Sequence, residues 1–405
     1  LSLAQHAMLA GIPKAPSRNN PLSNPDKGKI RRDWILGRMA SLGKITETEK
    51  IAARNTPVSA GFFGQVVEVD ADYVAEMVRR EMVERFGNAA YNDGYVVYTT
   101  IDAGMQQAAH DALLAGLRAY DWRHGWRGPE RRLAPREGET AEETRVRWQE
   151  ALRAMPTIAE LPPAIVTQVN ETGVTALLKS GDAIVLPWQD NLATVRRYRS
   201  VNQTRGPEPT AADLLAPGDL IRVRLVEEQW RLTQVPKAQS ALVSLDPKHG
   251  AIRALVGGMG FELSKFNRAT QARRQPGSNF KPFLYASALT QGITPSTVIN
   301  DAPVVLDNLA AAEIWRPEND SGKFYGPTRL REALIFSRNL VSIRVLQRVG
   351  VRTFIEFVEA LGFNTEGMQA NLTLALGTHA FTPLDIATGY TLLANEGFKV
   401  EPWLI

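Results

Sequence analysis

Residues 274–283, Arg-Gln-Pro-Gly-Ser-Asn-Phe-Lys-Pro-Phe, place a serine and a lysine three positions apart directly after a Pro-Gly turn. An apolar run follows, so the pattern predicts a helix that begins at this point. Residues i and i+3 share one face of a helix, and we therefore expect Ser278 and Lys281 to be neighbours in its first turn. A serine hydroxyl needs a base to become a nucleophile, and a buried lysine with a lowered pKa can be that base.

A second pair of polar residues, Ser337 and Asn339, opens another helical pattern further along the chain, with Leu340, Ile343 and Leu346 at helical spacing. Taken alone, either residue would be explained as a helix cap. Ser-x-x-Lys is likewise too short a pattern to identify a site by itself. The order of the two motifs carries more information than either motif does.

Composition limits the classes of protein to which the chain can belong. Its 405 residues exceed one ordinary core, so we expect several domains, and 44% hydrophobic with 22% charged residues is typical of globular proteins. The absence of cysteine excludes disulfides and thiol chemistry, and the five histidines lack the spacing of metal ligands, so we predict no metal and no cofactor. The net charge of +4 comes without a basic stripe carrying aromatics, and we predict no nucleic-acid binding.

The two ends of the chain predict an internal piece of a longer protein. Residues 1–5 read as the middle of a helix without an initiator methionine, and residues 400–405 read as the start of an extended segment. Neither a signal peptide nor an apolar run long enough to cross a membrane is present in the sequence.

Periodicity divides the chain into four parts. Residues 1–55 are predicted helical, and residues 56–117 form a connector. Within the connector we expect a strand around Val66, Val67 and Val69, a helix over 73–86, a strand over 96–101 and a helix capped by Asp102.

The third part, residues 118–236, predicts an inserted β domain. We expect a surface loop over 131–143 and then short strands separated by turns, which suggest a small OB-like barrel. The fourth part, residues 237–405, begins with a predicted hairpin and continues with helices. The expected strands cover residues 164–169, 174–178, 183–186, 220–226, 230–235, 241–245 and 251–258.

The chain resembles the bifunctional class A penicillin-binding proteins, the peptidoglycan synthases of Gram-negative bacteria, over nearly its whole length. The landmarks are residues 9–17, Thr100-Ile101-Asp102, the segment 123–129, the hairpin 241–258, Ser278-x-x-Lys281, Ser337-x-Asn339 and residues 374–377.

This resemblance implies an α+β multidomain fold. Residues 1–55 would be the C-terminal part of a lysozyme-like glycosyltransferase domain, and 56–117 a linker and the start of the transpeptidase region. Residues 118–236 would be an OB-like domain that docks a regulator, and 237–405 the N-terminal part of an α/β penicillin-binding transpeptidase domain related to serine β-lactamases.

The resemblance also implies a reaction and its residues. Ser278 would attack the D-Ala-D-Ala bond of a stem peptide, and Lys281 would take its proton. Ser337 would relay a proton to the leaving amine, and Asn339 would hold the substrate amide and Lys281. One oxyanion donor would be the backbone N–H of Ser278, and β-lactams would acylate the same serine.

Partners and location follow from the same resemblance. We expect stem peptides, a lipid-linked glycan precursor and an outer-membrane lipoprotein regulator as partners. We expect the periplasmic side of the inner membrane as the location, with a membrane segment preceding Leu1.

The sequence departs from the family pattern in two respects, and two other functions stay open. No Lys-Thr-Gly, Lys-Ser-Gly or His-Thr-Gly occurs, and no Glu-Asp-x-x-Phe of a glycosyltransferase occurs either. A serine β-lactamase would need a deacylating Glu-x-x-Leu-Asn, and the nearest segment, residues 366–371, has the wrong spacing. A non-catalytic binding or regulatory fragment is the other alternative.

Overall fold

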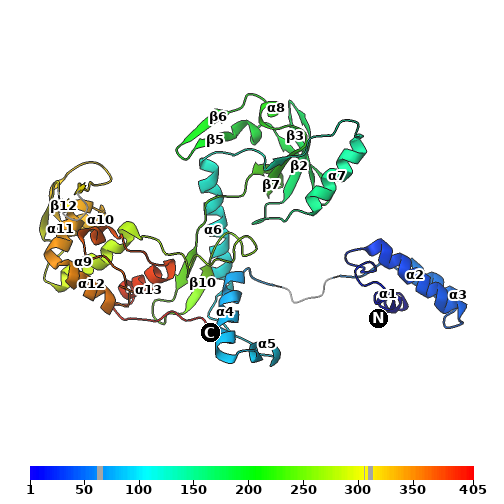
Figure 1. Cartoon of the computed structure of the whole chain (residues 1–405), viewed down its shortest axis with the longest axis horizontal. Coiled ribbons are helices and arrows are strands. Elements are labelled where there is room, and N and C mark those ends of the chain that lie inside the picture. The colour runs from blue at the N-terminus through cyan, green and yellow to red at the C-terminus, as the bar shows by residue number, and fades with distance from the viewer. Residues whose placement is uncertain (62–66, 305, 309–312) are drawn as a thin grey trace. The chain divides into compact units, whose positions relative to one another are not determined.

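The computed structural model describes residues 1–61, 67–304, 306–308 and 313–405. The chain divides into two compact units, Leu1–Glu68 and Val69–Ile405, and each is described here by itself. Figure 1 labels the helices and strands of both units.

The first unit is helical, as predicted for residues 1–55. Its helices are α1 (Leu3–Gly11), α2 (Pro25–Ser41) and α3 (Glu47–Asn55). Ser2 and Thr46 each form a capping box with the residue three positions on, which satisfies free backbone N–H groups at the starts of α1 and α3. Because Ser2 caps α1 and the helix begins at Leu3, the expectation that residues 1–5 lie in the middle of a helix is wrong. Proline stands at the start of α2, where its missing N–H costs nothing. Small and branched side chains from all three helices form the core: Ala4, Ala7, Leu36 and Ala53.

The second unit begins with α4 (Asp72–Phe86), α5 (Ala89–Asn92) and α6 (Ala103–Arg123). The helix predicted over 73–86 is confirmed, and Asp102 caps α6 as predicted, by accepting a hydrogen bond from the N–H of Met105. α6 continues to Arg123 and therefore passes the expected boundary between residues 117 and 118. Of the strand expected around Val66, Val67 and Val69, the first residue lies outside the described residues and the other two are not in a strand.

The strand predicted over 96–101 is wrong. This segment forms no ladder, although the N–H of Thr100 donates to the Leu404 carbonyl and the N–H of Asp102 donates to the Arg253 carbonyl. Val96 and Tyr98 are 76% and 84% exposed. β-Propensity expresses packing against neighbouring strands, and residues without such neighbours stay extended without becoming a strand.

The insert is built on an antiparallel sheet with the strand order β1–β7–β2–β3–β4, and β8 also pairs with β7, on the edge opposite β2. β5 and β6 form a separate hairpin. The five strands predicted in this part are confirmed. The elements are β1 (Arg131–Arg132), α7 (Ala141–Arg153), β2 (Pro163–Asn170), β3 (Gly173–Leu178), β4 (Ala183–Pro187), η1 (Leu192–Thr194), β5 (Arg196–Ser200), β6 (Gln203–Pro207), α8 (Ala211–Leu214), β7 (Asp219–Val226) and β8 (Gln229–Thr233).

Alternation along the strands explains why the insert has two cores. Neighbouring residues of a strand point to opposite faces, so Ala164 and Val166 of β2 join one core while Ile165 joins the other. α7 covers the second core with Trp148 and Leu152. The loop predicted over 131–143 is therefore only partly correct, because it contains β1 and the first turn of α7.

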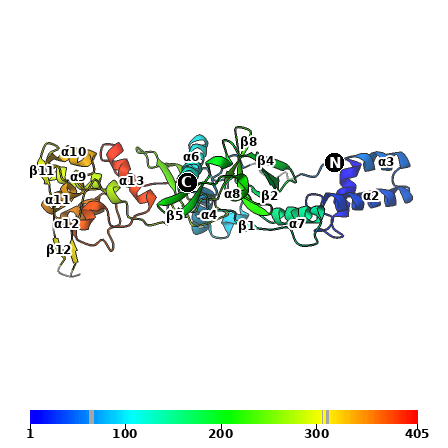
Figure 2. The same ribbon diagram turned by 90° about the horizontal axis from the view of Figure 1, so that it is seen from above.

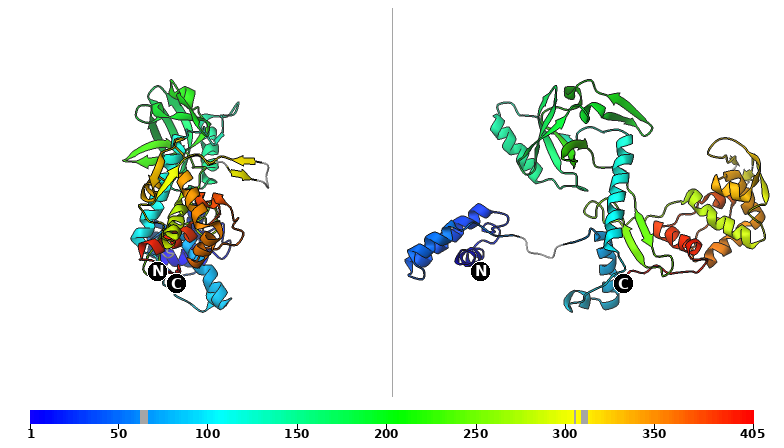
Figure 3. Two further views of the ribbon diagram at one scale, coloured as in Figure 1. Left: turned by 90° about the vertical axis from the view of Figure 1, so that its left-hand side faces the viewer. Right: turned by 180° about the vertical axis from the view of Figure 1, so that it is seen from behind.

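The hairpin predicted after the insert is confirmed as β9 (Leu242–Leu245) and β10 (Ile252–Val256), which pair antiparallel. α6 lies beside β10 (Figures 1 and 3), and apolar residues of both elements share a core. Gln106 of α6 accepts from the Leu255 N–H and donates to the Leu255 carbonyl. This side chain therefore replaces a strand neighbour for one residue of β10.

Helices α9 (Lys281–Thr290) and α11 (Asn339–Val349), both labelled in Figure 2, contribute many of the buried residues in the core of the C-terminal part. The rings of Phe280, Phe283, Phe363 and Phe381 meet at centroid distances of 4.9–5.5 Å and anchor the start of α9 in this core. The elements are η2 (Gly277–Phe280), α9 (Lys281–Thr290), β11 (Val298–Asp301), β12 (Leu306–Asn308), β13 (Glu313–Trp315), β14 (Gly326–Arg329), α10 (Leu330–Ile335), α11 (Asn339–Val349), α12 (Val351–Ala360), η3 (Leu372–Leu376) and α13 (Pro383–Ala394).

Candidate active site

Lys281 is the first residue of α9 and is almost completely buried, with 1% of its surface exposed. Burial disfavours the charged ammonium and lowers the pKa of Lys281 from 10.5 to about 8. A lysine with this pKa is partly neutral near pH 7.5, and only the neutral amine can accept a proton. Lys281 therefore has the lowered pKa that the sequence analysis expected of a lysine acting as a base.

Three acceptors surround the Lys281 Nζ. It donates to the carbonyl of Ser337 at 2.8 Å, to Ser337 Oγ at 2.9 Å and to Asn339 Oδ1 at 2.7 Å. Two of these are carbonyl oxygens, which can only accept, whereas the hydroxyl can also donate. A neutral Lys281 can keep both carbonyl contacts and direct its lone pair to the Ser337 hydroxyl. The structure thus brings together three of the four predicted site residues.

Ser337 has a left-handed backbone, with φ +50°, because it ends α10. Its N–H donates to the Leu334 carbonyl and the N–H of Arg338 donates to the Ala333 carbonyl, which is the hydrogen-bond pattern of a Schellman motif. Glycine is the usual residue at this position, because a Cβ there costs roughly 1–2 kcal/mol. A serine at this position is a strained residue whose side chain contacts the buried Lys281, a combination typical of functional sites.

Asn339 begins α11, and its contacts fix the orientation of its amide. Oδ1 accepts from Lys281, and Nδ2 donates to the carbonyl of Glu318 at 2.9 Å. The charged form of Lys281 can only donate and a carbonyl can only accept, so the reverse orientation would lose both bonds. Among the described residues Nδ2 has this one acceptor, so its second hydrogen can bind a ligand.

Ser278 is exposed and lies in η2, the 3-10 turn that leads into α9. The prediction placed it in the first α-helical turn, but the α-helix starts three residues later, because Gly277 is left-handed at φ +59° and Pro282 stands at the beginning of α9. Among the hydrogen bonds of the described residues, none joins the Ser278 hydroxyl to Lys281; the lysine binds Ser337 and Asn339 instead.

The backbone before Ser278 is held by Gly377. The N–H of Gly277 donates to the Gly377 carbonyl at 3.2 Å, and a Cβ on Gly377 would lie 2.2 Å from the Gly277 carbonyl oxygen. Gly257 and Gly258 also allow close packing, since a Cβ on either would lie within 2.7 Å of Tyr73 or Asn267.

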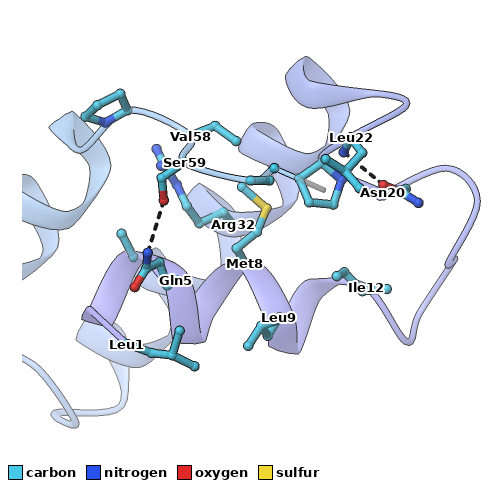
Figure 4. A pocket seen from close by; sticks show the side chains of 15 residues that line it. Leu1, Gln5, Met8, Leu9, Ile12, Asn20, Leu22, Arg32, Val58 and Ser59 are labelled. Carbon is cyan, nitrogen blue, oxygen red and sulfur yellow. Dashed lines mark hydrogen bonds between the residues drawn. The ribbon is translucent and has the colours of Figure 1, made fainter. Parts of the chain in front are cut away.

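Two pockets of similar volume differ in their distance along the chain from Ser278. One, of about 470 Å³, is lined by Gln275, Pro276 and Asn279, which flank Ser278, together with residues of α13. The other, of about 380 Å³, lies in the first unit and has a largely apolar lining that includes Met8 and Leu22 (Figure 4). Only the first of these adjoins the predicted nucleophile.

Sequence reasoning missed two residues that support the site, Asp301 and Asn319. The N–H of Asn339 donates to Asn319 Oδ1 at 2.9 Å, and Asn319 Nδ2 donates to both carboxylate oxygens of Asp301 at 2.9 Å. These residues lie in loop and strand-end positions without a recognisable spacing to either motif. A polar residue in a loop does not show from the sequence alone that it contacts a distant motif.

The described residues contain neither a membrane-spanning helix nor a cluster of metal ligands. None of the helices in the part of the chain that the structure describes is both long and apolar enough to cross a membrane. Within the same residues, no group of three acidic or histidine side chains is arranged to hold a metal ion.

Comparison with known proteins gives the family. A sequence model described as the penicillin-binding protein OB-like domain matches residues 126–238, and one described as the penicillin binding protein transpeptidase domain matches residues 240–405. The chain belongs to the penicillin-binding proteins. The predicted resemblance and the predicted order of an OB-like domain before a transpeptidase domain are therefore confirmed.

Two similar relatives of this penicillin-binding protein are both named penicillin-binding protein 1A. Penicillin-binding protein 1A of Pseudomonas aeruginosa is 47% identical over the whole chain, and that of Escherichia coli is 42% identical. The chain spans about half the length of these curated relatives, 48% and 47%. The crystal structure of penicillin-binding protein 1A from Haemophilus influenzae is 38% identical with a TM-score of 0.82, covering 100% of this chain and 57% of that one.

Proposed function

We propose that this chain carries part of the active site of a peptidoglycan D,D-transpeptidase that works through an acyl-enzyme on Ser278. The observation that carries the proposal is the buried Lys281, whose Nζ contacts Ser337 Oγ and Asn339 Oδ1 and whose pKa is lowered to about 8 by burial. The match to the transpeptidase domain supports the same reaction.

In the first step, the Ser278 oxygen forms a bond to the carbonyl carbon between the two D-alanines of a stem peptide. Lys281 takes the hydroxyl proton, and the C–N bond of the tetrahedral intermediate breaks. The leaving amine of the terminal D-alanine receives a proton through the Ser337 hydroxyl, which contacts Lys281. The free hydrogen of Asn339 Nδ2 binds a carbonyl of the peptide, and the Ser278 N–H is one oxyanion donor.

In the second step, an amine of a neighbouring stem peptide attacks the ester carbonyl and Ser278 leaves with its proton restored. The same groups act in reverse, because Lys281 and Ser337 remove the proton from the incoming amine. A β-lactam reacts by the first step alone, since its opened amide remains attached to the acyl group and cannot leave.

The wider roles are proposals about the whole protein. We infer that residues 1–55 are the C-terminal part of a glycosyltransferase domain that uses a lipid-linked glycan precursor, and that 56–117 connect it to the transpeptidase region. Residues 118–236 would dock an outer-membrane lipoprotein regulator. Residues 237–405 would be the N-terminal part of the transpeptidase, on the periplasmic side of the inner membrane.

Labelling with a fluorescent penicillin tests the proposal, with mass spectrometry to locate the adduct. We expect a stable adduct on the peptide that contains Ser278, loss of the adduct in Ser278→Ala, and unchanged labelling in Ser296→Ala, which removes an exposed hydroxyl of the same unit. Labelling of Ser278→Ala at the original level would remove this serine from the mechanism. Rapid release of opened drug would instead favour a hydrolase.

A further inference from the structure

The carboxylate of Asp301 is fully buried at the end of β11, with 0% of the residue exposed. Its hydrogen-bond donors are Asn319 Nδ2, at 2.9 Å from each oxygen, and the N–H of Tyr325, at 3.2 Å. None of the ion pairs formed by the described residues includes Asp301. A buried carboxylate without a cation is costly, so its neutral donors must be well placed to keep it there.

The carboxylate determines how the Asn319 side chain is turned. Asn319 is 5% exposed, and its Nδ2 faces only acceptors, the two Asp301 oxygens and the carbonyl of Lys323 at 2.8 Å. Its Oδ1 must then point the other way, where it accepts from the backbone N–H of Asn339. A reversed amide would put a donor against that N–H and an oxygen against a carboxylate.

Asn319 accepts a hydrogen bond from the N–H of Asn339, the first residue of α11. An N–H at this position has no acceptor within the helix. Asn319 therefore acts as the cap of α11, although it is twenty residues away in the sequence. Its neighbour Glu318 accepts from Asn339 Nδ2, so the same short segment holds both the backbone and the side chain of Asn339. Lys281 is the next group in this chain of contacts.

We propose that Asp301 and Asn319 are positioning residues for the Ser-x-Asn motif, and that they hold Asn339 with its Oδ1 on the Lys281 amine. The assignment deepens the proposed function and rests on it. Asp301 touches neither substrate nor Lys281, and it acts through Asn319 and Asn339.

The other polar groups near this chain of contacts are few. Tyr285, on α9, hydrogen-bonds to Ser342 of α11 at 3.1 Å, and burial raises its pKa to about 12, so it is neutral near pH 8. Arg338 stacks over the ring of Tyr325, 3.4 Å from the ring centroid. Burial is the cause that lowers the pKa of Lys281, without a charged partner. A change in its titration after substitution of Asp301 would therefore report its hydrogen-bond partners.

Asp301→Asn is a sharp variant because it keeps the shape and changes one oxygen to NH₂. Whichever way the new amide turns, its NH₂ faces a donor, since Asn319 Nδ2 contacts both oxygens and the Tyr325 N–H contacts one. Asn319→Ala is the second variant, and it removes the acceptor for the Asn339 N–H directly. Asp320→Asn is the matched control, because it makes the same chemical change at an exposed neighbour in the same loop.

The first measurement is the titration midpoint of Lys281. NMR of the chain labelled with ¹³Cε-lysine monitors the titration, and the Lys281 signal is assigned by its absence in Lys281→Arg. Loss of the Asn339 Oδ1 contact removes an acceptor that stabilises the ammonium, so we expect the midpoint to fall by about one pH unit in both variants. The control should keep the wild-type midpoint. Circular dichroism identifies any variant that does not fold. If one of the two variants does not fold, the other variant tests the positioning role.

The second measurement is the rate constant of acylation by fluorescent penicillin. Misplacement of a reacting group by about 1 Å can reduce a rate about a hundredfold, so we expect a tenfold to hundredfold loss in both variants. Folded variants with the midpoint and the rate of Asp320→Asn would overturn the positioning role. A wild-type chain that titrates as expected but is not acylated would instead contradict the proposed function, so the two failures are distinguishable.

Discussion

Gly377→Ala is expected to destabilise the turn that carries Ser278. The backbone at Gly377 is left-handed, with φ +69°, and the added Cβ would lie 2.2 Å from the Gly277 carbonyl oxygen and 2.9 Å from its carbon. A left-handed L-residue costs roughly 1–2 kcal/mol. Overpacking typically costs a further ~1–3 kcal/mol. This cost applies here because the obstructing atoms belong to the backbone of Gly277 and cannot rotate away.

Gly367→Ala separates these two contributions. Gly367 is also left-handed, with φ +75°, but nothing lies within 4 Å of the position of its Cβ, so only the conformational cost applies. Hydrogen exchange measured by mass spectrometry reports local stability in a chain of several domains. Peptides covering residues 272–285 should exchange at least about fivefold faster in Gly377→Ala than in Gly367→Ala, which corresponds to about 1 kcal/mol. Equal exchange in the two variants would refute the inferred backbone contact.

Two further predictions concern the proton transfer. The fall in the pKa of Lys281 from 10.5 to about 8 increases its neutral fraction near pH 7 by roughly 300-fold, so penicillin acylation of Ser278 should rise with pH and level off above about pH 8. A rate that is flat from pH 6 to pH 9 would show that this amine is not the base. Ser337→Gly should relieve left-handed strain and stabilise the folded chain by about 1 kcal/mol, while acylation falls. Denaturant unfolding and labelling check this pair of effects, and Ser337→Ala, which keeps the strain, should lose acylation without the gain in stability.

Most of the secondary structure could be predicted because its signals are local. The cap at Asp102 and the alternation in β2 and β4 each depend on residues within a few positions. The failed strand over residues 96–101 has a physical cause. Residues 96–101 have strand propensity but lack a ladder partner, and propensity cannot show whether a neighbouring strand is present.

The candidate site divides in the same way. Lys281, Ser337 and Asn339 were found from two short motifs, and the structure places their side chains in contact. Asp301 and Asn319 could not be found, because their role depends on a loop folding back over the start of α11. The contact between Gly277 and Gly377 is equally invisible in sequence, since it joins two backbones a hundred residues apart.

The serine that ends α10 has a consequence for protein engineering. A search for heat-resistant variants would favour glycine at position 337, because the left-handed backbone at that helix end is more stable without a Cβ. Such a variant would survive a thermal screen and still be inert toward penicillin. Stabilised libraries of this protein should therefore keep residue 337 fixed and be sorted by drug labelling as well as by melting.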